Sequence, residues 1–386
     1  MKQTSLQAEN IFRYTDRAES VFIPPENCAV MINDMLPDIV EGYGAYLLDT
    51  RDPAVQPEHF MVANEVGPII RIDEDIADGT FIALTSSDDP SISVLGSADI
   101  PDRTLFLTGL CNSNCIMCPY TTKHRCNESS ESLDVLQRFV HLMDPFAQYL
   151  CVTGGEPTLL RQDFLILMGD IRDYFEDCLV HVLTNGRIFY YSDFLHDFQR
   201  VRPGRTLLGI PVYGHNAQIH DNITQTPGSF EQTMMGLQRL YGAGEHIEIR
   251  IVVSALNYEW LIETAMMIIK LFPKVYGVSI MGLEMMGNAM LNRSKVWIGF
   301  DEARESITKC VDLLIENGVQ VQLYNYPLCK VDRRHWPIYR KSITPSKVEY
   351  LPACDECAMR QRCGGFFATT IHMPDITVVP FTKEQL

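Results

Sequence analysis

A group of three closely spaced cysteines restricts the fold of this chain more than any other sequence feature. The apolar run Leu105–Leu107 predicts a short buried strand, and Gly109 marks the turn that ends it. Cys111, Cys115 and Cys118 follow with C-x3-C-x2-C spacing. Three thiolates on one tight loop can bind three corners of a cuboidal iron–sulfur cluster, which leaves the fourth iron without a protein ligand.

Two other interpretations of this loop remain open from the spacing alone. The cysteines can be buried thiols, or they can belong to a zinc site. Structural zinc needs four ligands, and the nearest further thiol, Cys126, has no partner at the spacing typical of zinc sites. The spacing therefore favours a cluster with one open iron.

A second motif follows the next predicted strand, at residues 149–153. Gly154, Gly155, Glu156 and Pro157 form a Gly-Gly-Glu-Pro turn directly after this strand. Glycines lack a side chain that would block a ligand, so the backbone of such a turn can lie very close to a bound molecule.

Together, the cysteine loop and the Gly-Gly-Glu-Pro turn resemble the radical S-adenosylmethionine (radical SAM) superfamily. The resemblance implies an enzyme in which Cys111, Cys115 and Cys118 hold a catalytic [4Fe–4S] cluster whose open iron binds SAM. Reductive cleavage of SAM then gives a 5'-deoxyadenosyl radical, which abstracts a hydrogen atom from the substrate. The residue before the last cysteine is usually bulky or aromatic in this superfamily, and here it is Met117.

The resemblance also implies which residues contact SAM. The Gly-Gly-Glu-Pro turn meets the amino group of the methionine moiety, and Asn185 follows the third predicted strand. Arg250, in the fifth predicted strand, suits the SAM carboxylate because a guanidinium can bind a carboxylate with two hydrogen bonds. A routine Asn-Gly turn and an ordinary ion pair are the alternatives for these last two residues. The complete predicted set is Met117, Gly154, Gly155, Glu156, Pro157, Asn185 and Arg250.

The segment after the fourth predicted strand resembles one found in radical SAM enzymes that modify peptides. It contains His220-Asp221 and then Gly228–Phe230, but the arginine usual in that segment is missing. We expect His220 and Asp221 to be either a substrate-side pair or a structural hydrogen bond. Ser229 and Gln232 have the spacing of a capping box, which predicts a helix start.

Alternating strand and helix patterns predict an α/β fold: a partial (β/α)6 TIM-like barrel with a β-rich N-terminal domain and a cysteine-rich C-terminal extension. The predicted domains are 1–101, 102–318 and 319–386. The N-terminal part contains short apolar runs and a predicted helix around 37–48. The predicted barrel strands are 104–107, 149–153, 179–184, 207–212, 247–253 and 275–280, with a further strand at 319–324. The predicted helices are 132–143, 163–174, 230–241, 259–271 and 302–316.

A second cysteine group lies beyond the barrel. Cys329, Cys354, Cys357 and Cys363 have spacings that fit a second tetrahedral site, for iron–sulfur or zinc. They resemble the shortened SPASM (twitch) extension of peptide-modifying enzymes, which favours an auxiliary iron–sulfur cluster over zinc. The segment Cys354–Ala368 resembles the HxsC-type maturase of the His-Xaa-Ser system, which implies modification of a ribosomally made peptide or protein.

Composition limits the partners. The formal net charge of -17 argues against a broad nucleic-acid-binding surface. No apolar run is long enough to span a bilayer, and the N-terminus lacks the apolar stretch of a signal peptide. We therefore expect a cytoplasmic protein whose twelve cysteines are used for metal or redox chemistry. The expected partners are a peptide or protein substrate and an electron donor such as flavodoxin or ferredoxin, without nucleic acid or membrane.

Two alternatives remain. The first is a radical SAM enzyme of cofactor biosynthesis or RNA modification, although the acidic charge weighs against RNA. The second is a metal-binding adaptor without catalytic turnover.

Overall fold

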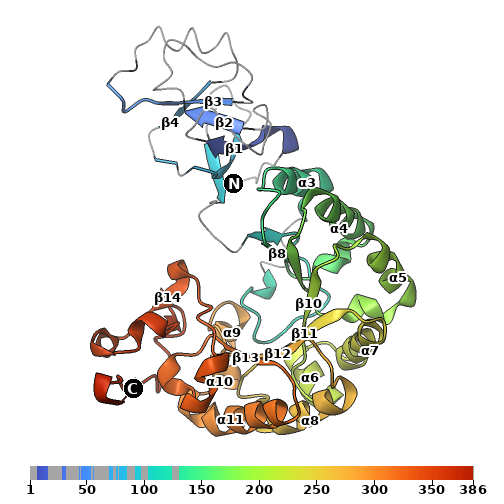
Figure 1. Ribbon diagram of the computed structural model, residues 1–386, viewed down its shortest axis with the longest axis vertical. Helices are drawn as coiled ribbons and strands as arrows, with labels where there is room; N and C mark the ends of the chain where they lie inside the picture. The colour runs from blue at the N-terminus through green and yellow to red at the C-terminus, as the bar shows by residue number, and fades with distance from the viewer. Residues whose placement is uncertain are drawn as a thin grey trace.

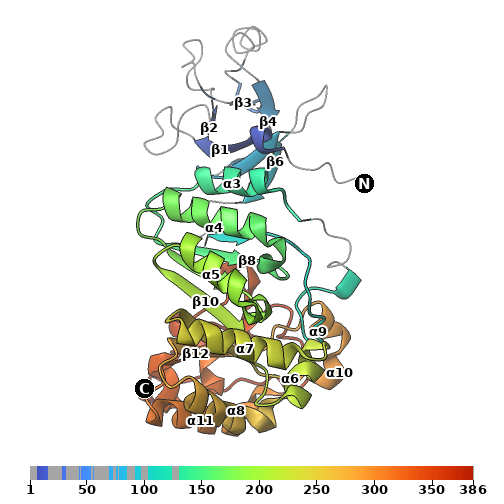
Figure 2. The same cartoon turned by 90° about the vertical axis from the view of Figure 1, so that its right-hand side faces the viewer.

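The computed structural model describes residues 7–15, 28–31, 43, 45–53, 55, 69–72, 75–76, 78–84, 92–96, 103–123 and 130–385. These residues contain a six-stranded sheet followed by a curved seven-stranded sheet, and a small two-stranded sheet near the C-terminus (Figures 1 and 2).

The seven-stranded sheet is the framework of the molecule. Its strand order is β13-β12-β11-β10-β9-β8-β7, and every neighbouring pair is parallel. Each strand thus lies beside the next in sequence, and all carboxyl ends meet at one edge. The strands are β7 (Thr104–Phe106), β8 (Tyr149–Thr153), β9 (Leu179–Leu183), β10 (Thr206–Pro211), β11 (His246–Val252), β12 (Gly277–Met281) and β13 (Val321–Tyr324).

Helices cover the outer face of this curved sheet (Figure 1). The longer ones are α3 (Leu133–His141), α4 (Gln162–Tyr174), α5 (Ser192–Val201), α7 (Ser229–Gly242), α8 (Leu261–Leu271) and α11 (Phe300–Glu316). Three short helices, α6 (Ala217–Thr224), α9 (Asn288–Leu291) and α10 (Arg293–Val296), lie in the connections after β10 and β12. One hydrophobic core runs between the sheet and the long helices. The predicted α/β partial barrel is confirmed; the sequence patterns did not predict α5 or the three short helices.

The N-terminal sheet has the order β4-β3-β2-β1-β5-β6. Strands β1 to β4 are parallel, whereas β5 and β6 are antiparallel to their neighbours. The strands are β1 (Ile11–Thr15), β2 (Cys28–Met31), β3 (Ala45–Asp49), β4 (Ile69–Ile72), β5 (Phe81–Leu84) and β6 (Ile92–Gly96). The predicted apolar runs at 69–72 and 81–84 are strands, while the run at 21–23 lies outside the described residues.

The helix predicted around 37–48 is wrong over its second half. Ala45–Leu48 belongs to β3, and all four residues are fully buried. A continuous apolar run that is buried on both faces fits a parallel strand, and its periodicity alone cannot distinguish a strand from a buried helix. Residues 37–42 and 44 lie outside the described part of the chain.

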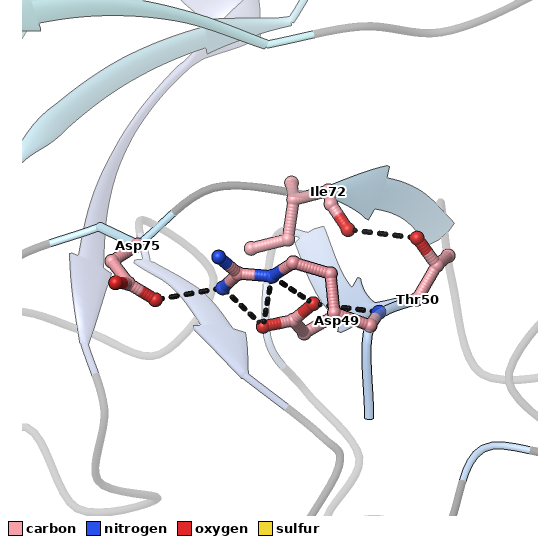
Figure 3. Close-up of polar contacts among 5 residues, drawn as sticks. Asp49, Thr50, Ile72 and Asp75 are labelled. Atoms are coloured by element: carbon pink, nitrogen blue, oxygen red, sulfur yellow. Dashed lines mark hydrogen bonds and ion pairs between the residues drawn. The ribbon is translucent and has the colours of Figure 1, made fainter. Parts of the chain in front are cut away.

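An exposed ion-pair network connects the ends of β3 and β4 (Figure 3). Arg51 binds Asp49 with its Nε and Nη2 atoms and donates to Asp75 over 2.7 Å. The Thr50 hydroxyl donates to the Ile72 carbonyl over 3.1 Å. The hydrogen bond from Arg51 lowers the pKa of Asp49. Because these side chains face water, the network fixes local geometry and contributes little to stability.

Helix α3 joins the two large sheets. Its Val135 side chain and the Leu142 that ends the helix pack into the core of the N-terminal sheet, whereas Leu136 and Val140 pack into the barrel core. Arg138 on the same helix donates to the carbonyl of Ile11 in β1 over 2.9 Å. In Figures 1 and 2 the N-terminal sheet accordingly lies beyond α3.

The C-terminal segment is mostly irregular. Its two short antiparallel strands are β14 (Val348–Glu349) and β15 (Phe366–Phe367). Figure 1 shows this segment beside β13 and α11. Within the described residues, no helix is both long and apolar enough to span a membrane.

Candidate functional site

The cysteine loop, residues 107–118, begins where β7 ends, at the edge where the carboxyl ends of the parallel strands meet. Cys111, Cys115 and Cys118 are all half-buried. The Ser113 N–H donates to the Cys111 sulfur over 3.4 Å. In barrels of this kind, the loops at the carboxyl ends of the strands build the active site.

The Gly-Gly-Glu-Pro turn holds the first part of this loop. The N–H of Gly155 donates to the Thr108 carbonyl over 2.7 Å, and that of Glu156 donates to the Leu110 carbonyl over 2.8 Å. A Cβ on Gly154 would lie 2.6 Å from the Thr108 carbonyl oxygen, and one on Gly155 would lie 2.3 Å from that of Leu110. These glycines are therefore required by the backbone of the cysteine loop itself. Their predicted contact with SAM stays a prediction.

The Glu156 carboxylate joins the ends of β8 and β9. It is buried and accepts from the Thr158 N–H, from the hydroxyls of Thr158 and Thr184, and from the Asn185 N–H, over 2.6–3.1 Å. Burial raises the pKa of Glu156, while these hydrogen bonds act in the opposite direction. Four donors from the chain occupy this carboxylate, so Glu156 positions the turn.

Asn185 and Arg187 hold the middle of the cysteine loop. The Asn185 amide donates to the Asn112 side chain over 2.6 Å. Arg187 donates to the Asn112 carbonyl and, over 3.0 Å, to the Ser113 hydroxyl, while its Nε donates to Gln232 in α7. The sequence analysis missed Arg187; its position just after the Asn-Gly turn was the only available signal.

Two short helices hold the rest of the loop. The N–H groups of Asn114 and Ile116 donate to the last carbonyls of α6, at Thr224 and Ile223, over 3.0 and 2.9 Å. From α9, the buried Asn288 amide donates to the Cys115 carbonyl over 3.2 Å. No sequence motif pointed to Asn288. The cysteine loop is thus fixed by hydrogen bonds from every side of the barrel edge.

Tyr213 is a buried residue on which the charges of all three thiols act. Burial of its hydroxyl raises the pKa of Tyr213 well above its usual value, and negative charge on Cys115, Cys118 and Cys111 raises it further. Arg250 acts on the same pKa in the opposite direction. The three cysteines and Arg250 are therefore near enough to the buried Tyr213 hydroxyl for their charges to act on it.

Arg250 forms an ordinary ion pair, which the sequence analysis named as the alternative to SAM binding. It binds Glu248 over 3.1 Å, and His181 binds the same carboxylate over 3.0 Å. Burial alone would raise the pKa of Glu248, but the contact with His181 and the charge of Arg250 lower it to about 2. Gly209 in β10 leaves room for this pair, because a Cβ there would lie 2.7 Å from His181 and 3.1 Å from Arg250. A contact of Arg250 with the SAM carboxylate remains a prediction.

His220 and Asp221 have structural contacts. The Asp221 carboxylate accepts from the N–H groups of Gly228 and Phe230 and from the Ser229 hydroxyl, each over 2.7 Å. The predicted capping box is therefore wrong: Ser229 is the first residue of α7, and Asp221 supplies the cap from the preceding helix. His220 is buried and accepts from a backbone N–H, and burial lowers its pKa to about 4.

Met117 and Pro157 lie in packed surroundings. Met117 is buried in a hydrophobic cluster with Ile223 of α6 and Met285 of the loop after β12. Pro157 is buried at the start of a short 3-10 helix. Both side chains stabilise the loops that carry the site, and their predicted contact with SAM is untested.

The four cysteines of the C-terminal segment surround one cavity. Cys329, Cys354, Cys357 and Cys363 all line one cavity, although Cys329 is distant from the others in sequence. The N–H groups of Leu328 and Gly365 donate to the Cys363 sulfur over 3.3 and 3.4 Å. Hydrogen bonds to cysteine sulfur are among the features that tune iron–sulfur clusters, so this donor set fits such a group.

Among the residues that the structure describes, no three His, Cys, Asp or Glu side chains are placed to hold a single metal ion.

Three other cysteines are embedded in the barrel. Cys151, Cys178 and Cys310 are buried, and burial raises the pKa of Cys178 to about 11 and that of Cys310 to about 12. Thiols with such pKa values are unreactive. Cys126 lies outside the described residues.

Comparison with known proteins finds similarity over the barrel. Residues 105–268 match the model of the Radical SAM superfamily. The AdoMet-dependent heme synthase of Methanosarcina barkeri is 29% identical over 161 residues, which cover 41% of this chain and 44% of that protein.

Solved structures with a similar fold have low sequence identity. Streptococcus suis SuiB, bound to its precursor peptide SuiA, is 12% identical with a TM-score of 0.44; the match covers 58% of this chain and 48% of SuiB. A radical SAM methyltransferase from Sphaerobacter thermophilus is 14% identical with a TM-score of 0.43, covering 70% of this chain and 82% of the other. The chain thus spans less than half the length of the heme synthase and of SuiB.

The family match begins at β7 and includes the cysteine loop, the Gly-Gly-Glu-Pro turn and strands β8 to β11. It therefore covers the residues that the hydrogen bonds bring together at the edge of the barrel, except Asn288 of α9. Residues 105–268 of the chain are thus similar to the Radical SAM superfamily.

Proposed function

We propose that the protein cleaves SAM reductively and uses the resulting radical to modify a ribosomally made peptide or protein. The observation that carries this proposal is the cysteine loop, whose backbone is held by the Gly-Gly-Glu-Pro turn, Arg187, α6 and α9 at the open edge of the barrel. When bound there, a [4Fe–4S] cluster supplies the electron that splits SAM into methionine and a 5'-deoxyadenosyl radical. Flavodoxin or ferredoxin is the proposed source of that electron.

The residues of the chain have distinct roles in this proposal. Cys111, Cys115 and Cys118 hold the cluster. Glu156 and Asn185 fix the backbone beside it, which leaves the N–H and carbonyl groups of the turn to bind the methionine moiety of SAM. Arg250 keeps part of its surface exposed while bound to Glu248, so it can still donate to a SAM carboxylate.

We further propose that Cys329, Cys354, Cys357 and Cys363 hold an auxiliary iron–sulfur cluster. The common cavity and the N–H donors to Cys363 support this assignment. The order and spacing of these cysteines resemble the twitch type of SPASM extension and the HxsC-type maturases. That resemblance is the basis for proposing a peptide substrate.

The similarity to the AdoMet-dependent heme synthase favours a second candidate function. The AdoMet-dependent heme synthase matches 161 residues of this chain. A role in cofactor biosynthesis, with a haem precursor as substrate, is therefore the specific competitor of the peptide proposal.

The deciding experiment starts with anaerobic reconstitution of the protein with iron and sulfide, followed by addition of SAM and dithionite. We expect 5'-deoxyadenosine from the wild type and none from the Cys111→Ala, Cys115→Ala, Cys118→Ala variant. Equal formation by the triple variant would refute the assignment of the cluster.

The substrate class is tested by asking which added compound increases the formation of 5'-deoxyadenosine and is itself modified. Candidate precursor peptides and haem precursors are added separately, and 5'-deoxyadenosine and the mass of each addition are measured. A mass change in a peptide supports the maturase proposal. A mass change confined to the haem precursor would replace it with the cofactor-biosynthesis function.

A further inference from the structure

The chain returns to the second cysteine cavity close to its C-terminus. Val378–Phe381, here called the closing segment, lines that cavity together with the four cysteines. It lies beyond every cysteine motif in the sequence, and nothing in its composition, Val-Val-Pro-Phe, suggests a role beside thiolates.

The backbone of the closing segment lies beside two of the cysteines. The Phe381 N–H donates to the Cys357 sulfur over 3.4 Å. The Val379 N–H lies near the Cys329 sulfur and acts to lower the pKa of that thiol. The side chain of Val379 is exposed, at 71%, so the backbone of this residue, and not its side chain, serves the cavity.

Aromatic and charged side chains anchor the closing segment. The Phe381 ring packs edge-on against Trp336, with 5.2 Å between centroids, and the Arg333 guanidinium lies 4.8 Å from the Phe381 ring centre. The Phe381 carbonyl accepts from the Ala358 N–H over 2.8 Å. Upstream, the buried Lys330 donates to the Thr377 hydroxyl over 3.4 Å. These contacts hold both ends of the segment across the cavity.

We propose that the closing segment is a functional part of the second cysteine site: its N–H groups set the reduction potential of the group bound there, and its bulk excludes water. This inference rests on the auxiliary cluster proposed above. The positive end of an N–H dipole stabilises negative charge on sulfur, and a reduced cluster carries more of that charge than an oxidised one. Hydrogen bonds to the sulfurs and solvent exposure are two of the factors that set cluster potentials.

Val379 permits a clean test of the N–H group. Val379→Pro removes the N–H that lies near the Cys329 sulfur, while Val379→Ala keeps it and serves as the matched control. Because residue 379 precedes Pro380, its backbone is already biased to extended conformations, which proline also adopts. The exposed valine side chain contributes little packing that either substitution could remove.

Both substitutions are made in the Cys111→Ala, Cys115→Ala, Cys118→Ala background, so that any iron belongs to the second site. After anaerobic reconstitution, iron content and reduction potential are measured by a redox titration followed in the visible spectrum. We expect the Pro variant to have a more negative potential than the Ala variant, or to lose iron that the Ala variant keeps. Equal iron and equal potentials in the two variants would overturn the inference.

A second variant tests the exclusion of water. A chain that ends after Thr377 lacks the closing segment, and we expect it to lose iron to a chelator faster than the full-length chain in the same background. An unchanged rate would contradict this part of the inference.

The full-length triple cysteine variant distinguishes a failure of this inference from a failure of the auxiliary-cluster proposal. If the full-length triple variant binds no iron and sulfide, the auxiliary cluster itself is wrong, and the inference is wrong with it. If it binds them but responds to neither change in the closing segment, the inference alone is wrong.

Discussion

At the scale of single residues, Arg187 connects the cysteine loop to α7. It donates to Asn112, Ser113 and Gln232, and hydrogen bonds from a charged donor each contribute about 1.5–3 kcal/mol. We predict that Arg187→Ala releases the loop and accelerates loss of iron from the first site to a chelator. Arg205→Ala is the control, because Arg205 pairs with Asp177 in an exposed ion pair. The same rate of iron loss in both variants would contradict a positioning role for Arg187.

His220 gives a pH-dependent prediction at the same scale. Burial lowers its pKa to about 4, whereas an unfolded chain has an ordinary histidine pKa of about 6.5. The unfolded state therefore binds a proton first as the pH falls below 6.5, and the stability that neutral His220 contributes is lost towards pH 4. Between pH 7.5 and 5 we expect this histidine to cost the wild type about 2 kcal/mol of unfolding free energy.

His220→Gln cannot titrate in this range and is the comparison. Urea unfolding of cluster-free protein at pH 7.5 and pH 5 measures the free energy of both proteins. The wild type should lose more stability than the variant between these pH values. Parallel losses would show that His220 is not the titrating group.

At the scale of elements, the close approach of the Gly-Gly-Glu-Pro turn to the cysteine loop sets a steric prediction. A Cβ on Gly155 would lie 2.3 Å from the Leu110 carbonyl oxygen, so Gly155→Ala must displace backbone. We expect a clear loss of iron from the first site. Gly169→Ala in α4 is the control, because its Cβ would meet only Val201, at 3.8 Å. Alanine inside a helix is expected to stabilise by about 0.5–1 kcal/mol.

Iron content and thermal unfolding of the two glycine variants are measured side by side. Normal iron in Gly155→Ala would mean that the cysteine loop can shift without losing its ligand geometry. That result would count against the tight packing of the two loops.

Helix α3 leads to a second prediction at this scale. Leu142 faces the core of the N-terminal sheet and Leu136 faces the barrel core, and both are buried. Truncating either to alanine should cost about 3 kcal/mol locally. We expect Leu142→Ala to speed proteolysis within the first 100 residues, and Leu136→Ala to speed it within the barrel. Limited proteolysis followed by mass spectrometry locates the cuts, and identical cutting patterns would show that α3 does not separate two cores.

At the scale of the whole molecule, the two cysteine sites lie on different parts of the fold. The first is on the loop after β7, and the second is built by the segment after β13. We predict that Cys354→Ala, Cys357→Ala removes roughly half of the iron if each site holds a four-iron cluster. Because the first site stays intact, SAM cleavage without substrate should survive, while substrate modification fails.

Iron analysis, 5'-deoxyadenosine formation and substrate mass are measured on this double variant. Zinc in place of the second half of the iron in wild-type protein would make the second site structural. Full substrate modification by the double variant would make it dispensable.

The sequence by itself determined the features that depend on neighbouring residues. The C-x3-C-x2-C loop, the Gly-Gly-Glu-Pro turn and the alternation of β7 to β13 with helices were predictable, because ligand spacing and hydrophobic periodicity are properties of short segments. The same local patterns failed for Ala45–Leu48, where a buried apolar run does not reveal its period. They also failed for Ser229, whose cap comes from Asp221 on another helix.

Only the tertiary structure decided which distant residues meet. Arg187 and Asn288 reach the cysteine loop from strand ends far along the chain, and their residue types carry no signal of that contact. Cys329 joins the later cysteines, and Val379 and Phe381 reach their sulfurs, because the segment after β13 folds back around one cavity. Such contacts depend on how whole elements pack, and packing is fixed by the complete core rather than by the spacing of any one motif.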